Sequence, residues 1–234
     1  MTPDARATST LAAAPHAATA PPGVPKGLFL FSILYGGMVI LAGVLGNKQV
    51  ALGPLAVEAG IFAFLLLVAL SSAVAELYGP RIAQRLVLWG FVPLLLSMAL
   101  IALVLALPAD AKMEPARLTA FETILGSTPR LMVAGIIAYG VSQFLNVTIF
   151  TRLRGAGKGS ATSVAVRGGI ASALSQAVDT LLFVSIAFLG VFPIATLLLG
   201  QMLAKVVLSL AVIPFVITGL VSLGRWLDRE GPLA

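Results

Sequence analysis

The chain alternates long apolar runs with short polar stretches. After residue 26, six apolar runs follow one another, each near the roughly 20 residues that a helix needs to cross a bilayer. They are Gly27–Leu45, Leu55–Leu77, Leu86–Leu107, Leu131–Phe150, Gly168–Phe192 and Ile194–Leu220. The strands of a membrane barrel would instead alternate with a period of two. The pattern therefore predicts an all-α integral membrane protein with six transmembrane helices. Pro54, Glu58 and Gly60 interrupt the start of the second run, so its boundary is the least defined.

Composition supports the same class. Hydrophobic residues make up 59% of the 234 residues, and charged residues only 10%, against about 25% in a soluble domain. The chain has no cysteine, which excludes disulfides and thiolate metal sites. Its one histidine, His16, lies in residues 1–26, an Ala-, Pro- and Thr-rich segment that we predict to be a disordered cytoplasmic tail. We expect a transporter domain over residues 27–222 and a short cytoplasmic tail over 223–234.

The net charge of +6 bears on orientation rather than on nucleic-acid binding, because basic residues gather in the cytoplasmic loops of membrane proteins. Six helices place both termini on one side. Ten basic residues lie on that side: Arg6, Lys26, Arg81, Arg85, Arg152, Arg154, Lys158, Arg167, Arg225 and Arg229. The opposite loops hold four: Lys48, Lys112, Arg117 and Arg130. The positive-inside rule therefore predicts that both termini are cytoplasmic.

Two of the runs carry matched polar rows of the form S-Q-x-x-[N/D]-x-x-x-F. The fourth run contains Gln143, Asn146 and Phe150, and the fifth contains Gln176, Asp179 and Phe183. Residues three apart share one face of a helix. A carboxylate at membrane depth costs about 2.5–3.5 kcal/mol on insertion scales, so Asp179 must face protein, water or substrate. We expect the two rows to meet in a polar cavity; the alternative is that the amides only bridge helices.

Other charged residues extend this candidate site. Lys205 lies near the middle of the sixth run, and an ion pair with Asp179 would lower the cost of both charges. Glu76 and Arg167 are expected at the cytoplasmic mouth. Amides, a carboxylate and a stacking face from Phe150, Phe183 or Tyr139 suit a planar, hydrogen-bonding, nearly uncharged molecule. The chain has no HExxH or GxSxG motif, and we expect neither an enzyme nor a cofactor or metal site.

Four stretches carry a resemblance to a known family. They are SSAVAELYGPRIAQRLVLWGF at 71–91, YGVSQFLNVTIFTRLR at 139–154, VRGGIASALSQAVDTLLFVSIAF at 166–188 and GQMLAKVVLSLAVIPF at 200–215. With these the chain resembles, over roughly residues 28–222, the VUT family of bacterial queuosine precursor transporters. The resemblance implies a multi-pass inner-membrane importer of 7-deazaguanine bases such as preQ0 and preQ1, used for tRNA modification.

The resemblance also implies binding residues. Together with the polar rows they form one set: Ser72, Glu76, Gln143, Asn146, Phe150, Arg167, Gln176, Asp179, Phe183 and Lys205. The chain departs from the family pattern at Ser72 and Asn146, where the family usually has carboxylates.

Two alternatives stay open at this point. One is a substrate-capture subunit of a vitamin importer that depends on a partner ATPase, and the other is a permease for another small polar heterocycle. The expected partners are the small-molecule substrate and membrane lipid, without nucleic acid, and self-association into a homo-oligomer is left open.

Overall fold

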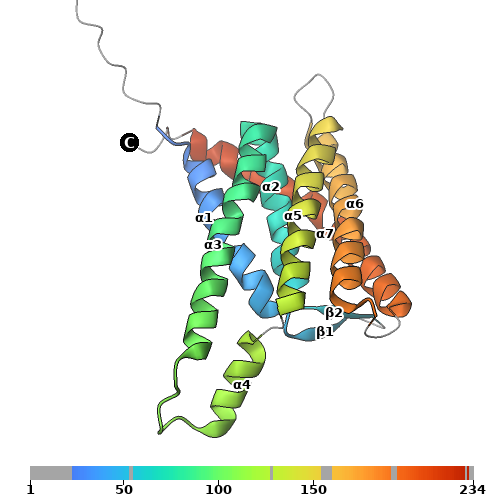
Figure 1. Cartoon of the computed structure of the whole chain (residues 1–234). Coiled ribbons are helices and arrows are strands. Elements are labelled where there is room, and N and C mark those ends of the chain that lie inside the picture. Colours follow the sequence, from blue (N-terminus) through green and yellow to red (C-terminus); the bar gives the residue numbers. More distant parts are fainter. Residues whose placement is uncertain are drawn as a thin grey trace, which may run out of the picture.

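The chain forms a helical bundle with one small hairpin (Figure 1). The computed structural model describes residues 23–52, 55–126, 129–153, 160–190, 194–229 and 231. In chain order the elements are α1 (Lys26–Leu45), β1 (Gln49–Leu52), β2 (Leu55–Glu58), α2 (Gly60–Tyr78), α3 (Pro80–Ala106), α4 (Pro115–Leu125), α5 (Pro129–Arg152), α6 (Ala161–Phe188) and α7 (Ala195–Asp228). All of the helices except α4 are long and apolar enough to cross a membrane, which confirms the six predicted spans. The predicted tail over residues 1–26 lies almost entirely outside the described residues.

Two elements differ from the sequence prediction. The second apolar run was expected to be helical from Leu55, but its first residues form strand β2, which pairs antiparallel with β1. The backbone N–H of Ala59 donates to the carbonyl of Lys48 (2.7 Å) and closes the hairpin, so α2 begins only at Gly60. The second difference is α4, an eleven-residue helix inside the predicted outer loop. Short apolar runs cannot be assigned to strand or helix from their pattern alone.

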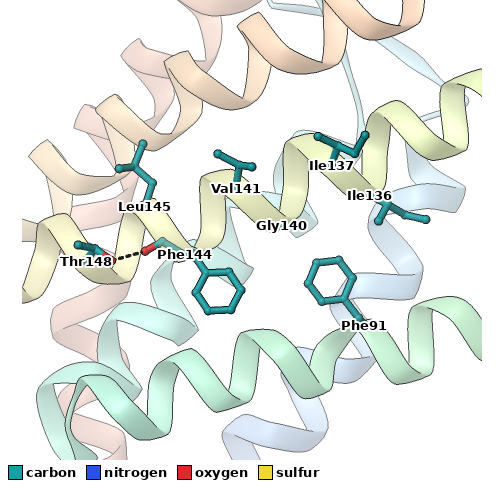
Figure 2. A pocket seen from close by; sticks show the side chains of 8 residues that line it. All are labelled: Phe91, Ile136, Ile137, Gly140, Val141, Phe144, Leu145 and Thr148. Atoms are coloured by element: carbon teal, nitrogen blue, oxygen red, sulfur yellow. Dashed lines mark hydrogen bonds between the residues drawn. The ribbon is translucent and has the colours of Figure 1, made fainter.

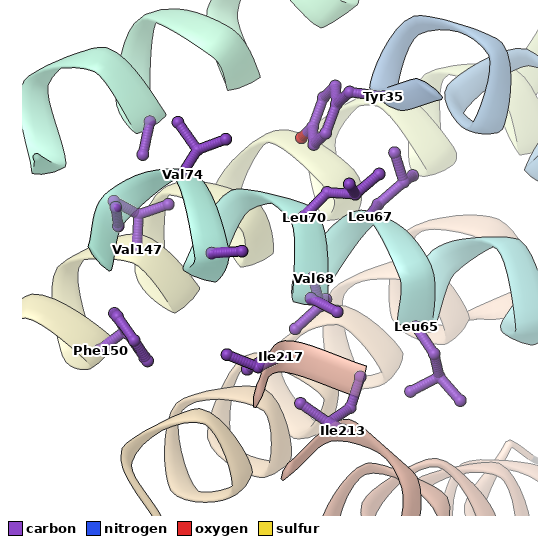
Figure 3. Packing of buried hydrophobic residues seen from close by; sticks show 14 of the residues in the cluster. Tyr35, Leu65, Leu67, Val68, Leu70, Val74, Val147, Phe150, Ile213 and Ile217 are labelled. Atoms are coloured by element: carbon purple, nitrogen blue, oxygen red, sulfur yellow. The ribbon is translucent and has the colours of Figure 1, made fainter. Parts of the chain in front are cut away.

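Helix α2 is the centre of the bundle. In the most apolar stretch of α2, 72% of the residues are buried inside the protein, against 17% in that of α1 and 11% in that of α3. Figure 3 shows why: side chains of α2 point in several directions, and Val68 lies toward Ile213 and Ile217 of α7. The apolar side chains of α3 are largely exposed, as expected of a helix that faces acyl chains.

The two ends of the bundle differ. At one end, which we call the termini face, Asp228 of α7 accepts hydrogen bonds from the backbone N–H of Gly27 (2.9 Å) and the hydroxyl of Tyr78 (2.8 Å). Gly79 then reverses the chain into α3 with a φ of +94°, a conformation that favours glycine. The hairpin and α4 lie at the opposite end, the hairpin face (Figure 1).

Candidate functional site

Polar side chains run through the bundle from one face toward the other, among α2, α5, α6 and α7. This polar column consists of Ser71, Ser72, Glu76, Ser142, Gln143, Asn146, Arg167, Gln176, Asp179 and Lys205. All are buried except Lys205, whose side chain is still only 12% exposed. Buried polar groups are expensive in a membrane protein unless they are paired or functional, so each contact of the column needs an explanation.

An ion pair lies near the middle of the column. Lys205 Nζ is 3.1 Å from Asp179 Oδ2, which confirms the predicted pair. The hydroxyl of Ser142 donates to the other carboxylate oxygen, Asp179 Oδ1 (3.1 Å), and so joins α5 to α6 at this level. The ammonium group of Lys205 also lies 6.0 Å from the centre of the Phe64 ring. Each oxygen of the Asp179 carboxylate therefore has a partner.

A cavity of about 380 Å³ reaches this ion pair. Its volume falls in the range of small-molecule sites, roughly 300–1,000 Å³. The residues around its inner part are Phe64, Tyr139, Asp179, Phe183 and Lys205. Further lining comes from Gly46, Asn47 and Gly60 beside the hairpin and from Ile124 and Leu125 of α4, so the cavity extends toward the hairpin face. Of the residues named from the sequence, the structure brings Tyr139, Asp179, Phe183 and Lys205 together around it.

Aromatic rings form one wall of the cavity. Tyr139 meets Phe64 edge to face, with ring centres 5.9 Å apart, and meets Phe91 in the same way at 5.3 Å. Its hydroxyl donates to the hydroxyl of Tyr35 on α1 (2.8 Å), which holds the ring in place. Sequence reasoning named Tyr139 but missed Phe64 and Tyr35, because an aromatic residue in an apolar run carries no signal that separates a cavity wall from the core.

The amides of α5 turn toward α2. Asn146 Nδ2 donates to the hydroxyls of Ser71 and Ser72 (both 3.1 Å) and to the carbonyl of Val68 (3.3 Å). Ser71 also donates to Gln143 Oε1 (3.3 Å). The two predicted rows thus meet through Ser142 and Asp179, while the amides of α5 are held by α2. Ser72 and Asn146, the two departures from the family pattern, are in direct contact.

Several atoms at this level of the column have hydrogen-bonding capacity left over. Among the described residues, no partner is found for Gln143 Nε2, Asn146 Oδ1, Ser172 Oγ, or either amide atom of Gln176, all of which are buried. Leaving such a group unsatisfied costs about 1–3 kcal/mol. We call Gln143, Asn146 and Gln176 the amide layer. Their unsatisfied donors and acceptors suit the recognition of a polar ligand.

A second ion pair lies deeper, toward the termini face. Arg167 Nη2 is 3.0 Å from Glu76 Oε2, and the side chains are 4% and 1% exposed. The guanidinium carbon lies 4.8 Å from the centre of the Phe150 ring. Arg167 was expected in the loop at the mouth, but α6 begins at Ala161 and carries it into the protein. Phe150, one of the three residues named from the sequence as a possible stacking face, packs against this guanidinium group.

Another hollow lies between α3 and α5 (Figure 2). Its volume is about 650 Å³ and its lining is apolar, from Phe91, Ile136, Ile137, Gly140, Val141, Phe144, Leu145 and Thr148. The Thr148 hydroxyl donates to the carbonyl of Phe144 (2.7 Å), so it is already used within the helix. A hollow of this composition suits acyl chains rather than a polar solute.

Six helices long and apolar enough to cross a membrane, packed around a polar column that a cavity reaches, are typical of a multi-pass membrane transporter. Comparison with known proteins agrees: residues 58–219 match the family described as "Putative vitamin uptake transporter". The chain therefore belongs to this family of transporters.

One relative is the "Probable queuosine precursor transporter" of Bacillus subtilis (strain 168). It is 33% identical over 144 residues, which are 60% of this chain and 61% of the relative. The match therefore spans less than two thirds of the length of that relative. No solved structure matches the chain.

Proposed function

We propose that the protein imports a planar, hydrogen-bonding heterocycle of the 7-deazaguanine class across the bacterial inner membrane. The observation that carries this proposal is the cavity lined by Asp179, Lys205 and aromatic rings, together with the amide layer, whose Gln176 lies about one helical turn from Asp179 on α6. A carboxylate accepts hydrogen bonds from adjacent N–H groups, and amides offer both donors and acceptors. The name of the Bacillus subtilis relative supports the same substrate class.

We assign a role to each binding residue from its position in the cavity or in the polar column. Asp179, Lys205, Phe183 and Tyr139 meet the substrate in the cavity, where the rings offer stacking faces. Gln143, Asn146 and Gln176 bind it once it moves deeper, and Ser72 supports Asn146. The Glu76–Arg167 pair, with Phe150, closes the column on the side of the termini face.

The orientation follows from charge. We propose that the termini face is cytoplasmic, because the basic excess on that side persists after buried Arg167 is set aside. The cavity then opens toward the outside of the cell. The described conformation is thus suited to receive substrate, with the Glu76–Arg167 pair between the substrate and the cytoplasm.

The test is uptake in bacteria that cannot make queuosine precursors and lack their own transporter. Cells expressing the chain are given a low concentration of precursor, and queuosine in tRNA is measured. The wild type should restore queuosine, Asp179→Asn should not, and the matched control Asp110→Asn, in the exposed loop before α4, should behave as wild type. If the well-expressed wild type restores queuosine with neither preQ0 nor preQ1, the proposed substrate is refuted.

Purified protein in proteoliposomes addresses the energy source. Uptake of precursor by the chain alone would exclude dependence on a partner ATPase. Binding without uptake, with transport only in cells, would instead identify a substrate-capture subunit.

A further inference from the structure

One hydroxyl group connects both amides of α5. Ser71 lies on α2, is fully buried, and has its oxygen 3.1 Å from Asn146 Nδ2 and 3.3 Å from Gln143 Oε1. The same oxygen is 3.0 Å from the carbonyl of Val68, one turn earlier in α2. Ser71 accepts a hydrogen bond from Asn146, and its single hydroxyl proton is shared between two acceptors, the Val68 carbonyl and Gln143 Oε1. Because Val68 and Ser72 hold Asn146 as well, Ser71 acts mainly on how Gln143 is presented.

More than one contact determines the orientation of the Asn146 amide. A backbone carbonyl can only accept a hydrogen bond, so the contact with the carbonyl of Val68 (3.3 Å) must be made by the amide nitrogen. Ser72 accepts a further bond from the same nitrogen (3.1 Å). The carbonyl oxygen Oδ1 of Asn146 consequently points away from α2 and is left as an acceptor without a partner among the described residues.

The orientation of the Gln143 amide depends on fewer hydrogen bonds than that of Asn146. Its one hydrogen bond in the described part of the chain is the one that Oε1 accepts from Ser71, which leaves Nε2 as a free donor. Without this hydroxyl the amide could rotate by half a turn and present its oxygen instead. Gln176, fully buried and with both amide atoms unpartnered, adds one donor and one acceptor at nearly the same level. This level follows from the Ser142–Asp179 contact, which sets α5 against α6.

We propose that Ser71 is a positioning residue that sets the hydrogen-bonding polarity of the amide layer. With Ser71 in place, Gln143 presents a donor and Asn146 an acceptor, which complement a ligand edge that carries a carbonyl beside a ring N–H. A lactam edge has this arrangement, whereas an amidine edge, with a ring nitrogen acceptor beside an amino donor, reverses it. This inference rests on the proposed function, because it concerns the same binding site.

Two ligands with the same ring system separate the two edges. 7-Deazaguanine carries the lactam edge and 7-deazaadenine the amidine edge. A mismatched edge leaves buried polar groups unpaired, which reduces affinity by roughly 10-fold or more per contact. The quantity to measure is the ratio of the two dissociation constants, by calorimetry with purified protein in detergent. A change of stability alone alters both affinities together and leaves this ratio unchanged.

Five variants, one of them a control, test the role of the hydroxyl. Ser71→Ala should lower the preference for 7-deazaguanine about 10-fold, whereas Ser71→Thr, which keeps a hydroxyl, should retain it. Ser32→Ala is the matched control, because Ser32 is exposed on α1 and bonds only to its own helix through the carbonyl of Leu28 (2.8 Å) among the described residues. Gln143→Met removes the presented donor, and adding Ser71→Ala to it should cause no further loss, because Ser71 acts through Gln143.

The outcomes are distinct. An unchanged ratio in Ser71→Ala, or a further loss in the double variant, would overturn the role of Ser71 while the wild type still binds 7-deazaguanine. Absence of binding of either ligand to the wild type would overturn the proposed function itself. If Ser71→Ala does not fold, Gln143→Met still tests the inference. An unchanged ratio of the two dissociation constants in that variant would contradict it equally.

Discussion

Replacing Glu76 by Gln should destabilise the protein through Arg167. The two side chains are 1% and 4% exposed and 3.0 Å apart, so the substitution leaves a buried guanidinium group without its counter-charge. Breaking a buried pair from one side costs about 3–5 kcal/mol, against about 0–1 kcal/mol for an exposed pair. Arg167 keeps the bond from Nε to the carbonyl of Ser163 (3.2 Å) and the Phe150 ring. We therefore expect the lower end, about 3 kcal/mol, or roughly a 150-fold change in the unfolding equilibrium.

The assay is SDS-induced unfolding in mixed micelles, followed by circular dichroism. Glu122→Gln on α4 is the matched control, because Glu122 is exposed and its loss should change stability by less than about 0.5 kcal/mol. The double variant Glu76→Gln, Arg167→Met removes both charges and should recover to within about 1–2 kcal/mol of wild type. Two results would refute the reasoning: a Glu76→Gln variant as stable as the control, or a double variant whose loss equals the sum of the single losses.

The remaining predictions concern packing, the termini face and orientation. A Cβ at Gly90 would lie 2.7 Å from a ring carbon of Tyr35, so Gly90→Val should displace that ring and lower substrate affinity at least several-fold, measured by calorimetry; unchanged affinity would contradict this. Tyr78→Phe removes the hydrogen bond to Asp228 and should lower unfolding stability by about 1 kcal/mol, whereas no loss would show that the contact contributes nothing. Because the chain has no cysteine, Asn47→Cys introduces a single thiol at the cavity lining. An impermeant maleimide should label it in intact spheroplasts and not in sealed inside-out vesicles, and the reverse pattern would invert the proposed orientation.

The sequence alone was enough for the six helices. A lipid-facing segment must satisfy its backbone hydrogen bonds internally, so a long apolar run has helix as its outcome whatever its neighbours are. The Asp179–Lys205 pair was also predictable, because two opposite charges at similar depth in consecutive helices have few other partners. Local rules of this kind do not depend on the packing of the bundle.

Tertiary structure decided the rest. Glu76 and Arg167 are 91 positions apart, and Ser71 and Asn146 are 75 apart, so no spacing in the sequence relates them. They meet because α2, the most buried helix, packs against both α5 and α6. The pattern along one helix shows which residues share a face, but the neighbour of that face depends on how all six helices share the interior. For this reason the sequence pointed to the polar residues, and only the packing determined which of them line the cavity, which form the amide layer and which close the column.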